Sequence, residues 1–341
     1  MDSVCIFLRY ISAKLKTLSH FVVGITRKFS FNLIRFIALS SVIFLQLSRA
    51  QGATYPLPLN DSDLVGKIKY ITARESDTLV DIARRFDLGF NEVTAANPTV
   101  DPWLPGKGTR ILLPTRFILP QAPREGVVVN IAEMRLYYFP LTENGLHKVV
   151  ITYPIGIGRE GWATPIGKFK VIDKIVKPSW TAPPSIIAEY ASQGIQRDRI
   201  VPPGPDNPLG DYALTLNEPG YFIHGTNKPF SIGRRVSHGC LRLYPEDIDQ
   251  LFKKIPRDTA VRIVNQPYKA GLENGILFLE AHEPINDTDP TGINLTPVVS
   301  VVIAATKFKL GNSSWEKATS VATRHSGIPT PIANTTSVAK K

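Results

Sequence analysis

Cysteine is nearly absent from this chain of 341 residues, which contains only Cys5 and Cys240. A scaffold held together by several disulfides is therefore excluded. Neither Cys-x-x-Cys nor His-x-x-x-His spacing occurs, so the usual ligand pattern of a zinc module is missing as well. Beyond Cys5, near the N-terminus, the chain has one thiol, and its neighbours decide whether that thiol is inert or reactive.

Long apolar runs are also missing. The N-terminal run Phe36–Leu47 has twelve residues and is broken by polar side chains, whereas a membrane-spanning helix needs about 20. Basic residues precede this run, and Ser48–Ala50 and Gln51–Ala53 follow it, each ending in the small residue that a signal peptidase prefers. Residues 1–53 are therefore predicted to be a signal peptide that directs the protein to the periplasm, or an N-terminal anchor if they are retained.

Acidic residues are outnumbered, with 29 Asp and Glu against 40 Lys and Arg and a formal net charge of +11. Residues 1–50 hold seven of the basic residues and one acid, so the remainder is only moderately basic. This balance suits an anionic partner such as a cell wall. Because no Lys/Arg run with interleaved aromatics follows, a nucleic-acid partner is not predicted.

A small α+β unit is predicted over residues 69–114. Its expected elements are a strand at Lys69–Thr72, a helix after Asp77-Thr78, a helix at Asn91–Ala96 and a strand at Arg110–Pro114. This order, together with Ala96-Asn97-Pro98 and Leu104-Pro105-Gly106, resembles a LysM domain with its βααβ fold. The resemblance implies binding of N-acetylglucosamine-containing glycan, here peptidoglycan. A docking unit that no longer binds sugar is the alternative.

Residues 125–265 are predicted to form a mainly β domain that is β-sandwich-like. The expected strands are Val127–Asn130, Arg135–Phe139, Lys148–Tyr153, Lys168–Val176, Tyr212–Leu216, Tyr221–His224 and Ala260–Val264, and the expected helices are Ser185–Gln193 and Pro245–Lys254. Asn144-Gly145 is a hairpin signal. Ala260–Val264 is expected to be the last strand. Residues 284–341 are predicted to be a partly helical tail, with helices at 294–305 and 315–324, and loose from Thr330 onward.

The segments Tyr221–Thr226 and Gly233–Arg242 carry the candidate chemistry. An unperturbed thiol is only a few per cent thiolate at neutral pH, and a neighbouring imidazole takes its proton and stabilises the thiolate. His238 and Cys240 are two residues apart, and Gly239 between them permits a turn on which both side chains converge. This combination indicates nucleophilic acyl transfer.

Arg242 alternates to the same side as Cys240 if the segment is extended, and it can hold a carboxylate with two hydrogen bonds. An acidic peptide is therefore the favoured substrate. Three other interpretations stay open at this point. His224, His238 and Cys240 are all zinc-ligand types, although a fourth ligand is missing; Cys240 is buried and inert; or Arg242 is only a surface ion-pair partner.

Ser237-His238-Gly239-Cys240, preceded by His224-Gly225-Thr226, resembles the signature of the YkuD-type L,D-transpeptidases. Further matching blocks are Gly156-Ile157-Gly158, Thr164–Phe169, Lys177–Pro183, Asn207-Pro208-Leu209-Gly210 and Pro245–Ile248. The resemblance spans about residues 125–265. With an export signal and a LysM-like unit in front, it points to the periplasmic ErfK/YbiS-like enzymes, which form 3–3 crosslinks or attach a Braun-type lipoprotein.

The resemblance implies that Cys240 attacks the diaminopimelate carbonyl of a tetrapeptide stem and expels D-alanine, with His238 as the general base. The backbone at His224 and Gly225 is expected to orient His238, and the N–H groups of Gly239 and Cys240 to bind the oxyanion. The expected substrate-binding residues are Arg242, Gly225, Ser237, Thr226 and Tyr221. No metal or other cofactor is implied.

The acyl acceptor is left open: it is a second diaminopimelate, a lysine of an outer-membrane lipoprotein or a free D-amino acid. Water as the acceptor gives the alternative function, an L,D-carboxypeptidase or hydrolase that uses the same acyl-enzyme. A wall-binding protein with a degenerate catalytic domain is the non-enzymatic alternative, which the intact set of His224, His238, Cys240 and Arg242 disfavours.

Overall fold

The computed structural model describes residues 52–58, 62–142, 145–146, 148–196, 198–285, 295–306 and 312–334. Residues 1–51 of the predicted signal peptide or anchor, with Cys5, lie outside the described residues, as does Asn144 of the predicted hairpin. Within the described ranges, no helix has the length and apolar character needed to cross a bilayer.

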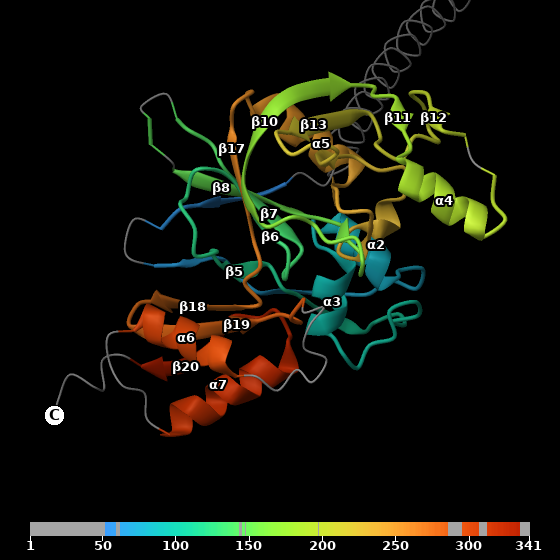
Figure 1. Cartoon of the computed structure of the whole chain (residues 1–341). Coiled ribbons are helices and arrows are strands. Elements are labelled where there is room, and N and C mark those ends of the chain that lie inside the picture. The colour runs from blue at the N-terminus through green and yellow to red at the C-terminus, as the bar shows by residue number, and fades with distance from the viewer. Residues whose placement is uncertain are drawn as a thin grey trace, which may run out of the picture. The chain divides into compact units, whose positions relative to one another are not determined.

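A curled sheet of nine strands has the order β1-β8-β7-β6-β17-β10-β13-β14-β16. Its strands β8, β7, β6, β17, β10 and β13 are labelled in Figure 1. The strands are β1 (Ala53–Pro56), β8 (Val149–Pro154), β7 (Arg135–Phe139), β6 (Gly126–Asn130), β17 (Ala260–Val264), β10 (Gly167–Val176), β13 (Tyr212–Leu216), β14 (Phe222–His224) and β16 (Leu241–Arg242). Neighbours are antiparallel except β6 with β17 and β14 with β16. Gly156, just past β8, bridges Arg242 of β16, so the last strand returns to the segment that follows β8.

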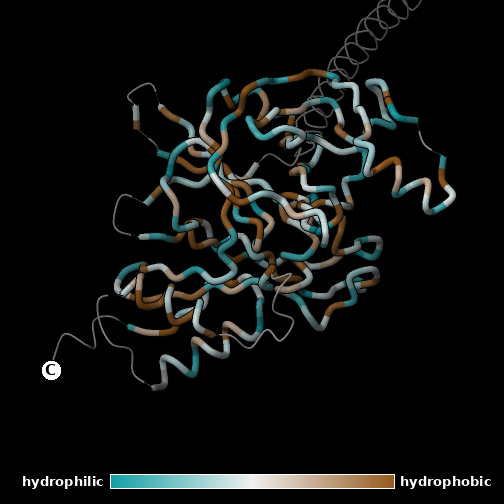
Figure 2. Tube along the Cα trace, viewed as in Figure 1, coloured by the Kyte–Doolittle hydropathy of each residue, from teal (hydrophilic) through white to brown (hydrophobic). Residues whose placement is uncertain are grey.

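Strand alternation explains the core. Val127 and Val129 of β6 enter one apolar cluster, whereas Val128 enters another on the opposite face. The helix α5 (Pro245–Lys254) contributes Ile248 and Leu251 to the first cluster. Hydrophobic stretches accordingly follow the strands of the main sheet (Figure 2). The predicted mainly β domain is confirmed as a strand-rich domain with a curled sheet.

The unit at 69–114 has the predicted element order. Its elements are β3 (Lys69–Thr72), α2 (Leu79–Arg85), α3 (Phe90–Ala96) and β4 (Arg110–Leu113), and β3 pairs with β4 in antiparallel fashion. Thr78 caps α2, as predicted, because its hydroxyl accepts from the N–H of Asp81 at 3.1 Å. A second small sheet, β2 (Leu64–Gly66) with β5 (Arg116–Ile118), flanks the unit.

The chain beyond residue 265 is more structured than predicted. β18 (Tyr268–Glu273), β19 (Ile276–Ala281) and β20 (Thr330–Asn334) form a three-stranded sheet packed with α6 (Thr296–Ala305) and α7 (Asn312–Arg324). Ala260–Val264 is the last strand of the main sheet in chain order, but the prediction that residues 330–334 are loose was wrong. The overlooked signal is Asn274-Gly275, whose positive φ angles of 51° and 75° make a two-residue hairpin turn.

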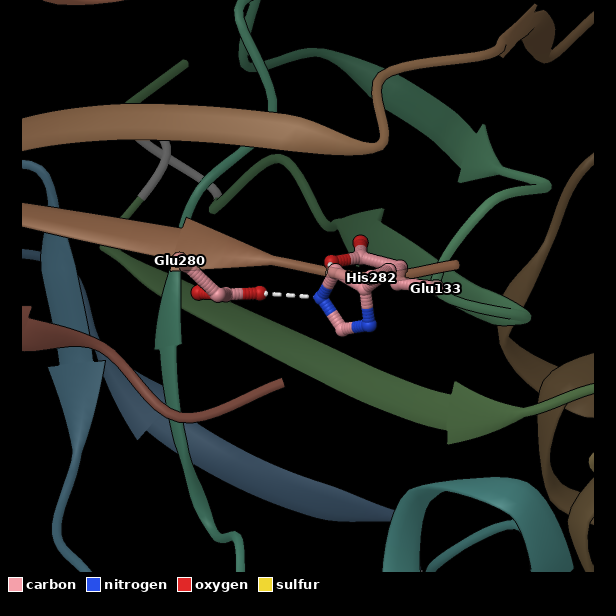
Figure 3. A group of neighbouring side chains, drawn as sticks. All are labelled: Glu133, Glu280 and His282. Atoms are coloured by element: carbon pink, nitrogen blue, oxygen red, sulfur yellow. Dashed lines mark hydrogen bonds and ion pairs between the residues drawn. The ribbon is translucent and has the colours of Figure 1, made fainter. Parts of the chain in front are cut away.

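A buried charged cluster joins this C-terminal sheet to the catalytic domain. The ammonium of Lys269 donates to the Ile118 carbonyl at 2.6 Å and pairs with Glu280 at 2.8 Å and with Glu133. Glu133, Glu280 and His282 hold ligand-type atoms within 4.8 Å of one another, with His282 Nε2 2.7 Å from Glu280 (Figure 3). Because Lys269 already brings a positive charge to both carboxylates, we interpret the cluster as a salt-bridge network and not as a metal centre.

Lys269→Met is expected to lower the free energy of unfolding by about 3–5 kcal/mol, because it leaves two buried carboxylates without their cation. Urea unfolding of the purified protein measures the loss. Lys107→Met is the matched control, since Lys107 and Glu75 are 3.8 Å apart on the surface with both side chains largely exposed, and such pairs contribute about 0–1 kcal/mol. Equal effects of the two substitutions would contradict a structural role for the buried cluster.

Candidate active site

The register of two parallel strands places the candidate site residues. β14 and β16 align Ile223 with Leu241 and His224 with Arg242. Ile223 and Leu241 are buried in the core, so alternation puts His224 and Arg242 on the opposite face. Cys240 immediately precedes β16 (Leu241–Arg242), and that its side chain shares one side with Arg242 stays a prediction.

The turn that carries the thiol is fixed by hydrogen bonds of its own. Gly239 has φ +106°, and a Cβ there would approach the ring of Tyr221 to 2.8 Å, so the position requires glycine. Ser237 Oγ donates to the Cys240 carbonyl at 2.6 Å and accepts from the Gly239 N–H at 3.2 Å. Thr164 Oγ1 donates to the Gly239 carbonyl at 2.9 Å. The Ser-His-Gly-Cys segment thus forms a turn that is stabilised by hydrogen bonds between its own residues.

These contacts correct two of the roles expected from the sequence. The Gly239 N–H is committed to Ser237, so it is not a free donor for an oxyanion. Ser237 is buried and its hydroxyl is used within the turn, so it braces the nucleophile and does not face substrate. Sequence reasoning identified both positions but had no means of knowing that they satisfy each other.

Three further residues expected to contact substrate have contacts within the protein. Thr226 is buried, and its Oγ1 accepts from the Lys228 N–H at 3.0 Å. The Gly225 N–H donates to the Tyr212 carbonyl at 3.1 Å. Tyr221 packs against the core and against Gly239. Of the three, Tyr221 is the residue that supports the turn.

The thiol of Cys240 is partly buried and held by backbone groups. Its Sγ donates to the Gly220 carbonyl at 3.5 Å. Burial raises the pKa of the Cys240 thiol, and the opposing effects of the Phe222 N–H and the Arg242 charge are smaller. The resting nucleophile is therefore a protonated thiol, which needs a base at the moment of attack.

His224 is the imidazole that strand pairing sets beside the segment carrying Cys240. It is buried, and its Nδ1 lies 2.6 Å from the Gly225 carbonyl, to which it donates a proton in the tautomer that leaves Nε2 as an acceptor. Burial, followed by the charge of Arg242, lowers the pKa of His224 to about 3. The imidazole is therefore neutral at neutral pH, with its orientation fixed by a backbone carbonyl.

His238 sits in a different environment. Its Nε2 lies 3.0 Å from Glu189 Oε2 and 3.2 Å from Arg159 Nη2, and its ring packs edge-on against Trp162 at a centroid distance of 4.7 Å. The contacts of His238 come from these side chains, and the Gly225 carbonyl expected to orient it contacts His224. Glu189 holds His238, and the Gly225 carbonyl holds His224 itself.

A cleft of about 270 Å³ opens beside the turn. Its lining comprises Trp180, Ile186, Tyr190, Pro208, Asn227, Lys228, Phe230, Ser231, Arg234, Val236, His238 and Arg242. Arg234 Nε and Nη2 and Arg242 Nε meet no acceptor among the described residues. The two guanidinium groups give the cleft a positive lining, which suits an anionic ligand.

Sequence reasoning missed the contribution of one helix to this cleft. The helix α4 (Pro184–Ser192), between β11 (Trp180–Thr181) and β12 (Ile200–Val201), carries Glu189 and Tyr190. The helix itself was predicted, but a lone glutamate on it has no pattern that links it to a histidine 49 residues away.

The zinc interpretation is not supported by the geometry. Among the described residues, the group of potential metal ligands that comes together is Glu133, Glu280 and His282, and the catalytic set is not such a group. The imidazole nitrogens are instead engaged with Glu189 and with the Gly225 carbonyl. A thiol on a fixed turn, near a buried neutral imidazole and a cleft lined by arginine, defines the site of a cysteine acyltransferase or peptidase.

Comparison with known proteins narrows this class. The YkuD model, described as the L,D-transpeptidase catalytic domain, matches residues 124–263. The probable L,D-transpeptidase YbiS of Escherichia coli K12 is 45% identical over 246 residues, covering 71% of this chain and 79% of the relative. YcfS of the same strain is 43% identical over 256 residues, with 72% and 79% covered. The chain belongs to the YkuD family of L,D-transpeptidases, which are cysteine enzymes.

Two other similarities were found. The probable L,D-transpeptidase ErfK/SrfK of Salmonella typhimurium is 39% identical over 285 residues, which cover 82% of this chain and 91% of the relative. Among solved structures, L,D-transpeptidase 3 from Mycobacterium tuberculosis is 17% identical, with 63% of this chain and 94% of that chain covered and a TM-score of 0.29.

Proposed function

We propose that the protein is an exported L,D-transpeptidase of peptidoglycan. Cys240 attacks the diaminopimelate carbonyl of a tetrapeptide stem, forms a thioester and releases D-alanine, and the acyl group then passes to an amine. The observation that carries the proposal is the placement of Cys240 on a fixed turn directly before β16, where strand pairing aligns His224, with its neutral imidazole, and Arg242.

His224 is the general base in this mechanism. Its acceptor nitrogen takes the proton from Sγ as the C–S bond forms, and the imidazolium returns that proton to the leaving amine of D-alanine. The positive charge of Arg242 stabilises the developing thiolate, as its effect on the pKa of Cys240 indicates. The Cys240 N–H is the backbone donor proposed for the oxyanion. His238, held by Glu189, positions substrate at the cleft wall.

Charge supports an acidic stem peptide as substrate. Arg234 and Arg242 both line the cleft and hold N–H groups without an acceptor among the described residues. Stem peptides carry several carboxylates, and each guanidinium binds a carboxylate with two parallel hydrogen bonds. The same positive lining disfavours cationic peptides.

The unit at residues 69–114 is proposed to be a LysM domain that holds the enzyme on glycan strands. Tyr70 and Trp103 are exposed aromatic side chains on it, and aromatic faces suit contact with sugar rings. Residues upstream of β1 are proposed to act as the export signal to the periplasm. Sedimentation of the catalytically inactive protein with intact sacculi would test the glycan contact, and no co-sedimentation would contradict it.

The reaction is tested with a disaccharide-tetrapeptide as both donor and acceptor. We expect D-alanine release, a thioester adduct on Cys240 by intact-mass spectrometry, and a crosslinked dimer. An added lipoprotein-derived peptide with a free lysine amine tests the second acceptor class. Release of D-alanine with only free tripeptide would instead establish the L,D-carboxypeptidase, and absence of any adduct would overturn the cysteine mechanism.

A further inference from the structure

Two aspartates meet in the interior, far along the chain from each other. Asp87 follows α2 and is 4% exposed, and Asp247 lies on α5 and is 0% exposed. Burial raises the pKa of Asp87 to about 7, and burial together with the charge of Asp87 raises the pKa of Asp247. The two carboxyl groups lie within side-chain hydrogen-bonding reach of each other, and neither oxygen of Asp247, nor Oδ1 of Asp87, meets an N–H donor within the described residues. The pair therefore lacks a cation.

The guanidinium groups that act electrostatically on this pair are already engaged. Arg135 is buried and holds Glu92 with two hydrogen bonds of 2.7 and 2.8 Å. Arg84 pairs with Glu246 at 2.8 and 2.9 Å. Each of these arginines thus balances another carboxylate, and a buried carboxylate pair without a cation is costly.

The backbone nitrogen of Ala53, in β1, already contacts Asp87 and would supply a positive charge if it were an ammonium. The Ala53 nitrogen donates to Asp87 Oδ2 at 2.7 Å, and Ala53 is the first residue of β1, which pairs with β8. As part of a peptide bond this nitrogen brings a single N–H and no charge. The bond before it follows Ala50-Gln51-Gly52, which puts small residues at the −3 and −1 positions that a signal peptidase reads.

We propose that a signal peptidase cleaves the Gly52–Ala53 bond and that the new α-ammonium of Ala53 becomes the cation of the Asp87–Asp247 pair. Hydrolysis adds one water across the amide: Gly52 leaves with the carboxylate, and the Ala53 nitrogen takes up a proton and stays charged. Cleavage takes place during export, before β1 pairs with β8. The site refines the predicted cut, which the sequence placed after Ala50 or Ala53.

Processing would then complete the fold. The ammonium brings two more N–H groups than the amide at the nitrogen that already contacts Asp87 Oδ2, and the other three oxygens of the pair have no N–H donor among the described residues. Asp87 belongs to the unit at 69–114, and Asp247 belongs to the catalytic domain. The positive charge of the mature N-terminus would therefore attract carboxylates from both parts of the chain. The inference rests on the export proposed above but not on the reaction catalysed.

The first test is the mass of the protein exported from its full-length gene. Intact-mass and N-terminal sequencing are expected to give Ala53 as the first residue. A mature chain that begins at Gln51 or Thr54, or an uncleaved chain, would overturn the assignment. Neither readout depends on transpeptidase activity, so a failure here is distinct from a failure of the proposed function.

The second test is the titration of the Ala53 amine in the exported protein, followed by NMR after isotopic methylation of the amine at a series of pH values. We expect the pKa to lie about one unit or more above the ordinary range of about 7.7–8.0, and Asp87→Asn to return it to that range. Asp211→Asn, at an exposed aspartate, is the control and is expected to change nothing.

If Asp87→Asn does not fold, Asp247→Asn gives the same comparison, because its neutral amide also removes negative charge from the pair. An amine that titrates in the ordinary range in the unsubstituted protein, or one that neither substitution shifts, would overturn the ion pair even if cleavage occurs at Ala53.

Discussion

Cys240→Ala is expected to lower the rate of D-alanine release about 10⁴- to 10⁶-fold, the range seen when an enzyme loses its nucleophile. Cys240 is the free cysteine within the described residues, and the adduct on this residue should vanish with the activity. Release of D-alanine is measured with the disaccharide-tetrapeptide by chromatography. The fold should persist, because alanine fits the space of a partly buried thiol.

The control for this substitution is the unfolding transition, which should match that of the unsubstituted protein. A second check uses the pKa of the thiol. Because burial raises the pKa of Cys240, alkylation by iodoacetamide should be slow at pH 7 and should accelerate as the pH rises above the ordinary range of about 8.5. Full reactivity at pH 6 would contradict the protonated resting thiol, and residual activity of a few per cent in Cys240→Ala would remove the thioester mechanism.

Local patterns in the sequence predicted much of the fold. The strands Arg135–Phe139 and Tyr212–Leu216 and the helix Pro245–Lys254 were predicted with the bounds that the structure has. These elements are recognisable because their apolar spacing repeats over one short window. The glycine of the nucleophile turn was also foreseen, and its positive φ bears out that reasoning.

Other features depend on contacts that no short window contains. The helix α4 was predicted, yet Glu189 reaches His238 only because the chain between β11 and β12 folds back over the cleft. The sequence favoured His238 as the base because it is two residues from Cys240. We propose His224 instead, since pairing of β14 with β16 sets its strand beside the segment of the nucleophile and burial keeps its imidazole neutral.

The C-terminal sheet was not predicted, for a different reason. β18 and β19 carry an Asn-Gly turn that is among the strongest local hairpin signals, but β20 reaches them across two helices. The resemblance to a known catalytic domain ends near residue 265 and therefore predicts nothing about the chain beyond it. Burial of Lys269 with Glu133 and Glu280 is likewise a tertiary event that charge patterning does not reveal.

His224→Gln is expected to slow formation of the Cys240 thioester about 100- to 10,000-fold, the contribution typical of a general base. Glutamine is similar in size and donates a hydrogen bond, but it does not accept the thiol proton. Single-turnover acylation, followed by intact mass, isolates this step. Because the pKa of His224 is about 3, the base stays competent through neutral and mildly acidic pH, and protonation of His224 should not limit the rate until the pH falls towards 3.

His238→Gln is the matched comparison, since it changes the other imidazole of the same cleft. His238 contacts Glu189 and Arg159, so its loss removes a positioning contact and is expected to slow acylation about tenfold or less, the scale of one hydrogen bond. The two variants therefore separate two assignments that the sequence could not separate. If His238→Gln loses several orders of magnitude while His224→Gln stays active, His238 is the base, and the buried imidazole of His224 is only a structural support for the turn.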